Sequence, residues 1–295
     1  MKAWVVLTAA GSGSRLGADV PKALAPVAGK TILDLALEQI VASPRVGGVV
    51  VTCTPGYEKE FETVVSQVLD AAIPWLVVHG GTSRQSSVYE ALKAIDLYFG
   101  AAGRNAQQVN PRQPIGAEPS GDVADGAGFP EPGKSEHVNA ELVEGADQSR
   151  GSCGPAVDLP ILVHDAARCL APTELFDSII KAIESGASAV IPVLPVVDTI
   201  KVVDPATGIV QSTPDRATLC TVQTPQGFKW EPLYQAHVVE ASRGASEADA
   251  ATDDAGLLES RGVPVETVPG DSRAFKVTVA EDFVRLERLL KLNHT

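Results

Sequence analysis

Short runs of apolar residues alternate along this chain with longer segments in which apolar residues recur at helical spacing. The apolar runs predict buried strands at residues 4–8, 49–53, 75–79, 161–164 and 189–194. The helical spacing predicts helices around residues 32–41, 61–68, 88–97, 175–183 and 278–290. Thr278 and Glu281 have the spacing of a capping box at the start of the last helix. Because strands and helices alternate, we expect an α/β fold of Rossmann-like type, with a mostly parallel sheet and helices on both faces.

Two segments interrupt this alternation within what we expect to be a single domain, residues 1–295. Residues 100–157 are rich in glycine, proline, serine and acidic residues, and their large apolar residues are scattered. Such a composition cannot bury enough apolar surface to offset the entropy of ordering, so we predict a disordered surface insert. In residues 196–217, β-branched runs at 199–203 and 209–211 flank a turn sequence with Asp-Pro and Thr-Gly pairs. This pattern predicts a protruding β-hairpin arm.

Composition and charge exclude several classes of protein. Hydrophobic residues make up 44% and charged residues 21% of the 295 positions, as in ordinary globular proteins. The net charge of −13 argues against a nucleic-acid partner, which usually requires a basic surface. No apolar run reaches the roughly 20 residues of a membrane helix, and the apolar start of the chain leads into a glycine loop rather than a cleavage site. We expect a cytoplasmic protein with no membrane partner.

The four cysteines, Cys53, Cys153, Cys169 and Cys220, are far apart in the sequence. They form no Cys-x-x-Cys pair and have no nearby histidine at metal-binding spacing, so the sequence argues against a zinc site and favours reduced thiols in the cytosol. Cys169 lies next to a candidate site and can be interpreted as a reactive thiol. Free cysteines are usually buried, however, so we expect a small buried side chain there.

The strongest chemical signal is the glycine-containing segment that follows the first predicted strand. Gly11 and Gly13 allow the backbone to close around a phosphate with its N–H groups pointing inward, and Arg15 and Lys22 add positive charge. Leu16 stands where a dinucleotide-binding fingerprint has a glycine, and no Gly-Lys-Ser/Thr triplet ends the loop. We therefore expect a triphosphate-binding loop of another kind, with a plain strand-to-helix turn as the alternative.

Asp165 directly follows the strand predicted at residues 161–164, at the sheet edge where open α/β sheets bind ligands. A carboxylate at that edge suits Mg²⁺ held jointly with phosphate oxygens, and Arg168 can bind a second phosphate. The alternative is a buried structural pair between Asp165 and Arg168. His164 and His79 stand at strand ends, and we expect both to point into the fold.

These segments, together with residues 80–88, 198–201, 223–226, 252–255 and 275–278, resemble the motifs of the 2-C-methyl-D-erythritol 4-phosphate cytidylyltransferase family of the non-mevalonate isoprenoid pathway. The resemblance covers the chain except for the insert. It implies the fold of nucleotide-diphospho-sugar transferases, transfer of CMP from CTP to the polyol phosphate with Mg²⁺, and a homodimer formed through the arm. The chain departs from the family at the insert, where the connection is normally short, at Thr82, often an aspartate, and at Cys169, usually a proline.

The resemblance also implies roles for individual residues. Arg15, Lys22 and Lys276 would be catalytic, by neutralising charge around the α-phosphorus, and Asp165 would hold the metal. The residues expected to bind the nucleotide are Ala9, Ala10, Gly11, Gly13, Gly81, Thr82 and Ser87. The residues expected to bind the acceptor are Arg168, Thr199, Arg216, Thr224 and Thr252. For the threonines, strand filling or helix capping is the alternative role.

Other functions stay open on the sequence alone. A ribitol 5-phosphate cytidylyltransferase shares the fold and the loop, although the small residues of the motif at 165–168 favour the isoprenoid enzyme. A uridylyl- or guanylyltransferase for sugar phosphates is a more distant alternative. A non-catalytic nucleotide sensor is disfavoured, because binding alone would not need all the cations and the carboxylate together.

Overall fold

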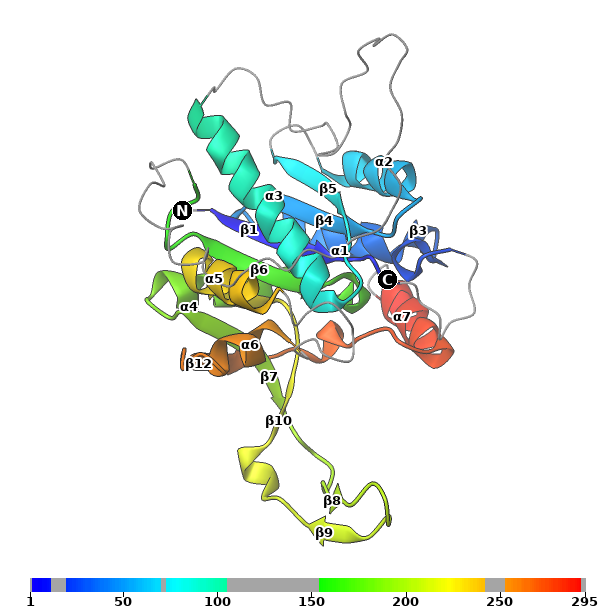
Figure 1. The fold of residues 1–295 in the computed structure, drawn as a ribbon. Helices are drawn as coiled ribbons and strands as arrows, with labels where there is room; N and C mark the ends of the chain where they lie inside the picture. The colour runs from blue at the N-terminus through cyan, green and yellow to red at the C-terminus, as the bar shows by residue number, and fades with distance from the viewer. Residues whose placement is uncertain (1, 12–19, 70–72, 105–153, 242–252, 293–295) are drawn as a thin grey trace, which may run out of the picture.

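The computed structural model describes residues 2–11, 20–69, 73–104, 154–241 and 253–292. An eight-stranded sheet forms its centre. Helices lie on both sides of this sheet, and an arm extends from one end of it (Figure 1). Within the described ranges, no helix combines the length and the apolar character that crossing a membrane requires.

All the predicted strands of the sheet are confirmed, with slightly different ends. In order across the sheet, the strands are β12 (Val265–Pro269), β7 (Ala189–Pro195), β11 (Gln226–Lys229), β6 (Pro160–Asp165), β1 (Ala3–Thr8), β4 (Val46–Cys53) and β5 (Trp75–His79). The eighth strand, β10 (Cys220–Val222), pairs with the end of β7 that β11 leaves open. Neighbouring strands from β6 to β5 are parallel, as are β7 and β12. β10 and β11 run antiparallel to the strands beside them. The sheet is therefore mostly parallel, as expected.

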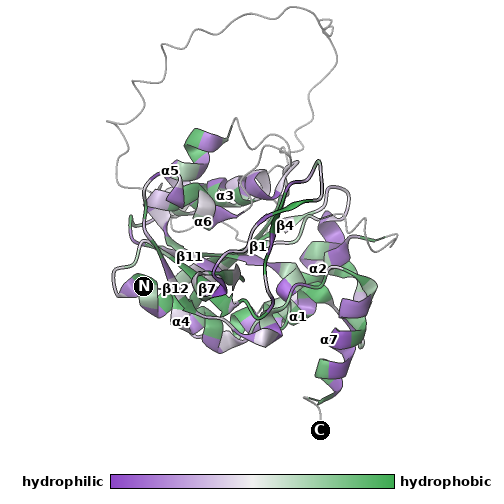
Figure 2. Ribbon diagram, turned by 90° about the horizontal axis from the view of Figure 1, so that it is seen from below, coloured by the Kyte–Doolittle hydropathy of each residue, from purple (hydrophilic) through white to green (hydrophobic). Residues whose placement is uncertain are grey.

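Helices cover both faces of the sheet (Figure 2). One face carries α1 (Ile32–Val41), α2 (Glu58–Val68) and α4 (Thr173–Glu184), and the other carries α3 (Arg84–Arg104), α5 (Trp230–Glu240) and α6 (Asp254–Glu259). Successive residues of β1 point to opposite faces, so Val5 and Leu7 belong to the first core, and Trp4 and Val6 to the second. The last helix, α7 (Ala280–Leu292), lies beside a short hairpin of β2 (Pro26–Val27) and β3 (Lys30–Thr31).

Two predicted boundaries are wrong. The insert was expected to begin at residue 100, but α3 continues to Arg104. Near this end of the helix, the ring of Phe99 packs against Trp4 of β1, with ring centroids 5.5 Å apart. Residues 105–153 lie outside the described residues. The start of α7 is capped by Asp282 rather than Glu281, because the helix begins at Ala280 and places Asp282 third. Its carboxylate accepts from the backbone N–H and hydroxyl of Thr278, at 2.6 and 2.9 Å.

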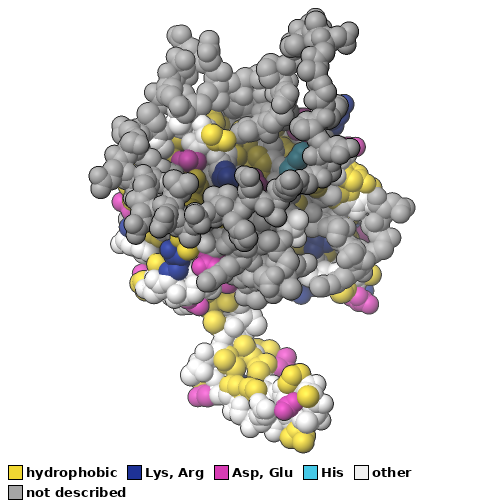
Figure 3. All heavy atoms as spheres, in the orientation of Figure 1, with side chains coloured by type: hydrophobic (Ala, Val, Ile, Leu, Met, Phe, Trp, Pro, Cys, Tyr) yellow, Lys and Arg dark blue, Asp and Glu magenta, His cyan; other side chains and the backbone are white. Residues whose placement is uncertain are grey.

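The predicted hairpin arm is present. β7 and β10 leave the sheet together and carry the antiparallel pair of β8 (Val202–Val203) and β9 (Val210–Ser212), whose paired segments are shorter than expected. Its turn is closed by Gly208, at φ +70°, whose N–H donates to the Asp204 carbonyl at 2.8 Å. Apolar side chains on this arm face solvent, with Val197 77% exposed, and they form much of its surface in Figure 3.

Candidate active site

Asp165 ends β6 beside the end of β1, where Thr8 is its partner in the strand register. The Thr8 hydroxyl donates to Asp165 Oδ1 at 3.2 Å. On the other side, Lys276 Nζ lies 2.9 Å from Oδ2 and Arg84 Nε lies 3.3 Å from Oδ1. Burial by itself would raise the pKa of this carboxyl, but the attraction of Arg84 and then Lys276 outweighs it and holds the pKa well below its usual range. Asp165 is therefore ionised at neutral pH.

Arg84 belongs to a buried chain of charges that sequence reasoning missed. It opens α3, and its Nη1 lies 2.7 Å from Oδ2 of Asp254, the first residue of α6. The other carboxylate oxygen of Asp254 lies 3.0 Å from Nε2 of the buried His237. Burial would raise the pKa of Asp254, but Arg84 and then His237 lower it to about 2. The Arg84 guanidinium, at the start of α3, thus links Asp165 at the end of β6 to Asp254 at the start of α6.

Lys22 and Lys276 are brought together although they come from distant parts of the sequence. Lys22 begins a short 3₁₀ helix, η2 (Lys22–Leu24), and its Nζ donates to the carbonyl of Val277, the neighbour of Lys276, at 2.9 Å. The other predicted catalytic cation, Arg15, and Gly13 lie outside the described residues. The described part of the loop therefore ends at Gly11, which is exposed.

The described residues predicted to bind the nucleotide lie next to one another. The N–H of Ala9 donates to Thr52 Oγ1 at 3.1 Å, and the Ala10 carbonyl accepts from the Thr54 hydroxyl at 3.2 Å. A side chain at Gly80 would collide with Ala10, so the glycine allows the two loops to touch.

The second loop is held at the start of α3. The Gly81 N–H donates to Ser87 Oγ at 3.0 Å, while Thr82 stands exposed beside it. The loops that follow β1 and β5 therefore touch each other, and the residues at their ends, Thr8 and Arg84, contact Asp165.

Arg168 does not form the alternative ion pair with Asp165. Its Nη1 donates to the Ala274 carbonyl at 2.8 Å and its Nη2 to the Val222 carbonyl at 3.3 Å. Its buried Nε has no hydrogen-bond partner among the described residues, and burial lowers the pKa of the guanidinium from its ordinary value. The two carbonyl bonds therefore fix the guanidinium beside the segment that carries Lys276.

Thr224 supports Asp165 from within the fold. Its hydroxyl accepts from the Asp165 backbone N–H at 3.0 Å and lies 2.9 Å from Nδ1 of His164. His164 is buried against the ring of Phe176, as expected, and burial lowers its pKa to about 3. His79 was expected to point inward as well, but it is exposed and pairs with Glu58 at 2.6 Å, because β5 ends there at the surface.

The remaining predictions divide between the arm and the core. Thr199 and Arg216 lie on the exposed arm, where Arg216 Nη1 donates to the Val197 carbonyl at 3.2 Å. Thr252 lies outside the described residues, and Asp253 caps α6 instead, accepting from the Gly256 N–H at 2.9 Å. Cys169 is buried, as expected, and burial raises the pKa of its thiol to about 12.

A Rossmann-like sheet with an ionised aspartate, clustered cations and a glycine loop at its carboxyl edge defines a site of the nucleotidyltransferase class. The family model IspD, 2-C-methyl-D-erythritol 4-phosphate cytidylyltransferase, matches residues 3–98 and 135–292. The chain belongs to this family and is a nucleotidyltransferase.

Relatives extend the match over the full chain. The 2-C-methyl-D-erythritol 4-phosphate cytidylyltransferase of Saccharopolyspora erythraea is 37% identical over 98% of this chain and 100% of its own. That of Streptomyces avermitilis is 34% identical over 97% and 90%. A crystal structure of the Thermus thermophilus cytidylyltransferase aligns with a TM-score of 0.61 at 25% identity, covering 99% of this chain and 100% of that one. The synthase structure from Anaerococcus prevotii, at 22% identity, 98% and 96% coverage and a TM-score of 0.65, supports the fold alone.

Proposed function

We propose that this protein transfers the cytidylyl group of CTP to 2-C-methyl-D-erythritol 4-phosphate, giving 4-diphosphocytidyl-2-C-methyl-D-erythritol and pyrophosphate. The observation that carries the proposal is the ionised Asp165 beside Lys276, at 2.9 Å, in a chain of this family. The relatives described above are named for methylerythritol phosphate, which disfavours ribitol 5-phosphate as the acceptor. We place the activity in the cytoplasm, since the three cysteines in the described ranges, Cys53, Cys169 and Cys220, form no disulfide with one another.

In this proposal the two loops after β1 and β5 bind CTP. The loop residues Gly11 and Gly13 receive the phosphates, and the pocket for cytosine is formed by Ala9, Ala10, Gly81, Thr82 and Ser87. The pyrimidine would fit between these small side chains, and a side chain at Gly80 would collide with Ala10 and disturb the pocket. Base selection then rests on short contacts rather than on net charge.

The residues at the sheet edge fit a Mg²⁺ ion. Asp165 offers an ionised carboxylate, a hard oxygen ligand of the kind Mg²⁺ shares with substrate phosphates. Bound there, Mg²⁺ would supply charge neutralisation to the triphosphate. Lys276 is partly exposed, so its ammonium can leave the carboxylate for a phosphate oxygen when substrates bind.

The reaction needs positioning and positive charge rather than a base. The acceptor phosphate is already anionic, and one of its oxygens attacks the α-phosphorus in line with the departing pyrophosphate. Lys22 and Lys276, which the structure draws together, and Arg15 neutralise the charge that grows there. His164 takes no part in proton transfer, because it is buried and its Nδ1 is engaged by Thr224.

We also propose a homodimer in which the arm completes the partner's acceptor site. The acceptor would be bound by Arg168 and Thr252 of one subunit and by Thr199 and Arg216 from the arm of the other, while Thr224, whose buried hydroxyl contacts Asp165 and His164, would support the site from within. Two observations support this. The arm projects away from the sheet edge of its own chain (Figure 1), and an isolated two-stranded hairpin with exposed valines and isoleucines gains stability when a partner covers it.

The assignment of substrates predicts a strict requirement in a pyrophosphate-release assay. The purified protein should turn over only when CTP, Mg²⁺ and methylerythritol 4-phosphate are all present, because each contributes a part of the in-line geometry. UTP, GTP and ATP, and ribitol 5-phosphate or a sugar 1-phosphate, serve as controls in turn. Faster turnover with ribitol 5-phosphate than with methylerythritol 4-phosphate would contradict the proposed acceptor.

The proposed dimer predicts complementation between two inactive variants, Lys22→Ala and Arg216→Ala. After equal mixing and subunit exchange, half of the dimers are mixed, and one of their two sites has both residues intact. Activity should therefore recover to about one quarter of wild type if Arg216 acts on the neighbouring subunit. Lys22→Ala mixed with the double variant provides the control, since every site then lacks Lys22. No recovery in proven mixed dimers, or full wild-type activity as a monomer in light scattering, would refute the arrangement.

A further inference from the structure

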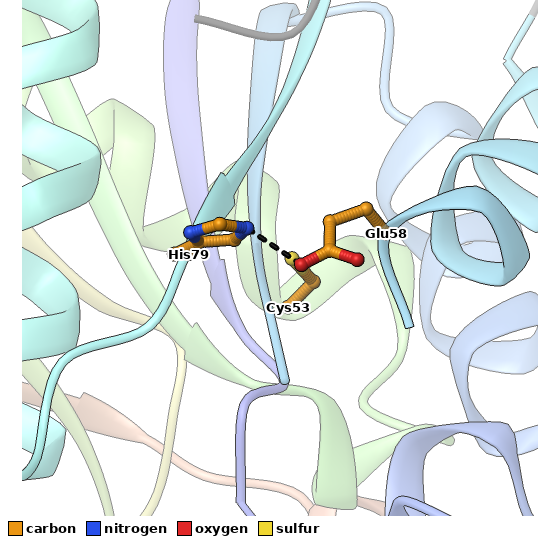
Figure 4. Close-up of side chains that lie close together, drawn as sticks. All are labelled: Cys53, Glu58 and His79. Carbon is orange, nitrogen blue, oxygen red and sulfur yellow. Dashed lines mark ion pairs between the residues drawn. The ribbon is translucent and has the colours of Figure 1, made fainter. Parts of the chain in front are cut away.

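A second group of ligand-type side chains lies at the ends of two neighbouring strands. Cys53 ends β4, His79 ends β5, and the strand register pairs these two residues directly. Glu58, the first residue of α2, completes the group. One ligand atom from each residue lies within 4.8 Å of the others, and Figure 4 shows the three side chains converging.

The three donors are those of a borderline transition metal rather than of Mg²⁺. Thiolate, imidazole and carboxylate together bind Zn²⁺ in proteins, whereas Mg²⁺ prefers oxygen ligands alone. Around a tetrahedral Zn²⁺, with bonds of about 2.0 to 2.3 Å, donor atoms stand about 3.3 to 3.6 Å apart. His79 Nε2 and Glu58 Oε1 are now 2.6 Å apart, so a small rotation of these two surface side chains would open the space.

Two of the three ligands are open to solvent. The side chains of His79 and Glu58 are 63% and 36% exposed, so an ion can bind them first and then meet the sulfur of the buried Cys53 beside them. A thiol binds a metal as its thiolate, so binding would form a metal–sulfur bond and release the thiol proton to water.

We propose that Cys53, Glu58 and His79 form a binding site for Zn²⁺ or a similar divalent transition metal, with water as the fourth ligand. The ligands of this site come from three separate elements, so they leave no Cys-x-x-Cys or Cys–His spacing in the sequence. For that reason the sequence alone argued against zinc. It also differs from the site at Asp165 in its donor chemistry, so the two ions would not compete.

The site borders the proposed nucleotide pocket. The N–H of Gly80 donates to the Cys53 carbonyl at 2.9 Å, and Thr54, the next residue, donates to the carbonyl of Ala10 at 3.2 Å. A metal that ties β4, β5 and α2 together would therefore stiffen the support of both loops. Because the metal would bind the folded protein and not the unfolded chain, it would raise the thermal stability of the protein.

Cobalt binding tests the proposal directly. The reduced, chelator-stripped full-length protein is titrated with Co²⁺ in excess Mg²⁺, so that oxygen-only sites are filled. We expect one equivalent to give the intense near-ultraviolet thiolate-to-cobalt band of a tetrahedral site, and one equivalent of Zn²⁺ to abolish it. Saturating Zn²⁺ should raise the Tm by about 5 °C.

Variants separate this site from a chance contact. Cys53→Ser should abolish the charge-transfer band, while His79→Gln and Glu58→Gln should weaken Co²⁺ binding at least tenfold. His79→Gln changes an exposed side chain and keeps the thiol, so its result stands even if Cys53→Ser fails to fold. Cys169→Ser and Cys220→Ser are the matched controls and should bind as wild type does. Absence of the band in the wild type, its persistence in Cys53→Ser, or unchanged affinity in both His79→Gln and Glu58→Gln would overturn the proposal.

Discussion

Asp165→Asn is expected to lower kcat for pyrophosphate release on the order of 1,000-fold, with an intact fold. The substitution keeps the size of the side chain and removes its charge. It thus removes the metal ligand that we propose and the negative charge that Lys276 and Arg84 now contact, at 2.9 and 3.3 Å, while Arg84 keeps its pair with Asp254. The rate is measured at saturating CTP and acceptor over a series of Mg²⁺ concentrations.

Asp158→Asn is the matched control for this measurement. Asp158 is an exposed carboxylate that pairs with Lys229 at 3.0 Å, and its loss should leave kcat and the Mg²⁺ dependence unchanged. If Asp165→Asn kept kcat within a few-fold of wild type, the assignment of the metal to this carboxylate would be wrong.

Arg84→Met is expected to lower the free energy of unfolding by about 3 to 5 kcal/mol, a loss that urea denaturation would measure at pH 7. Arg84 is the shared partner of Asp165 and of Asp254, which is only 1% exposed. Without the guanidinium, both carboxylates stay buried with less compensation. Arg45→Met removes a half-exposed pair with Glu184 at 2.8 Å and should cost about 1 kcal/mol at most.

The pH dependence of this loss has a defined sign. In the folded protein the pKa of Asp254 is about 2, below the value of about 3.9 for an unfolded chain. A lowered pKa contributes stability that is present above about pH 4 and is lost as the pH falls toward 2. The difference between wild type and Arg84→Met should therefore shrink over that window. A constant difference, or a loss no larger than that of Arg45→Met, would contradict this role of Arg84.

The long apolar strands and the strongly amphipathic helices could be predicted from the sequence, because each carries its own periodic signal. The strands of the sheet that were missed are β10, β11 and the edge strand β12, and the first two lack such a signal. β10 and β11 are short and are separated by Gln223, Thr224 and Pro225, and β11 contains Gly227 where the chain packs closely on Ile179. Tertiary contacts rather than local preference place them in the sheet.

The site could be predicted in part. Asp165 and Lys22 stood out because the first follows a buried strand and the second a glycine loop, whereas Lys276 followed only from the family resemblance. Arg84 did not stand out, since its partners, Asp165 and Asp254, are 81 and 170 positions away. A long-range charge network has no local sequence pattern, so only the folded arrangement of α3, α6 and β6 shows it.

The bond from Lys22 to the carbonyl of Val277 joins residues 255 positions apart. The segment that it anchors leads into α7, in which Leu286 is the one fully buried residue. The same segment is held by Arg168, which donates to the Ala274 carbonyl, and by the fully buried Val277. Because α7 adds few buried contacts, we expect this C-terminal segment to detach before the sheet unfolds. Detachment would carry Lys276 away from Asp165 and stop turnover. Loss of activity on heating would therefore precede the melting of the sheet, and the assay would report on the attachment of this segment.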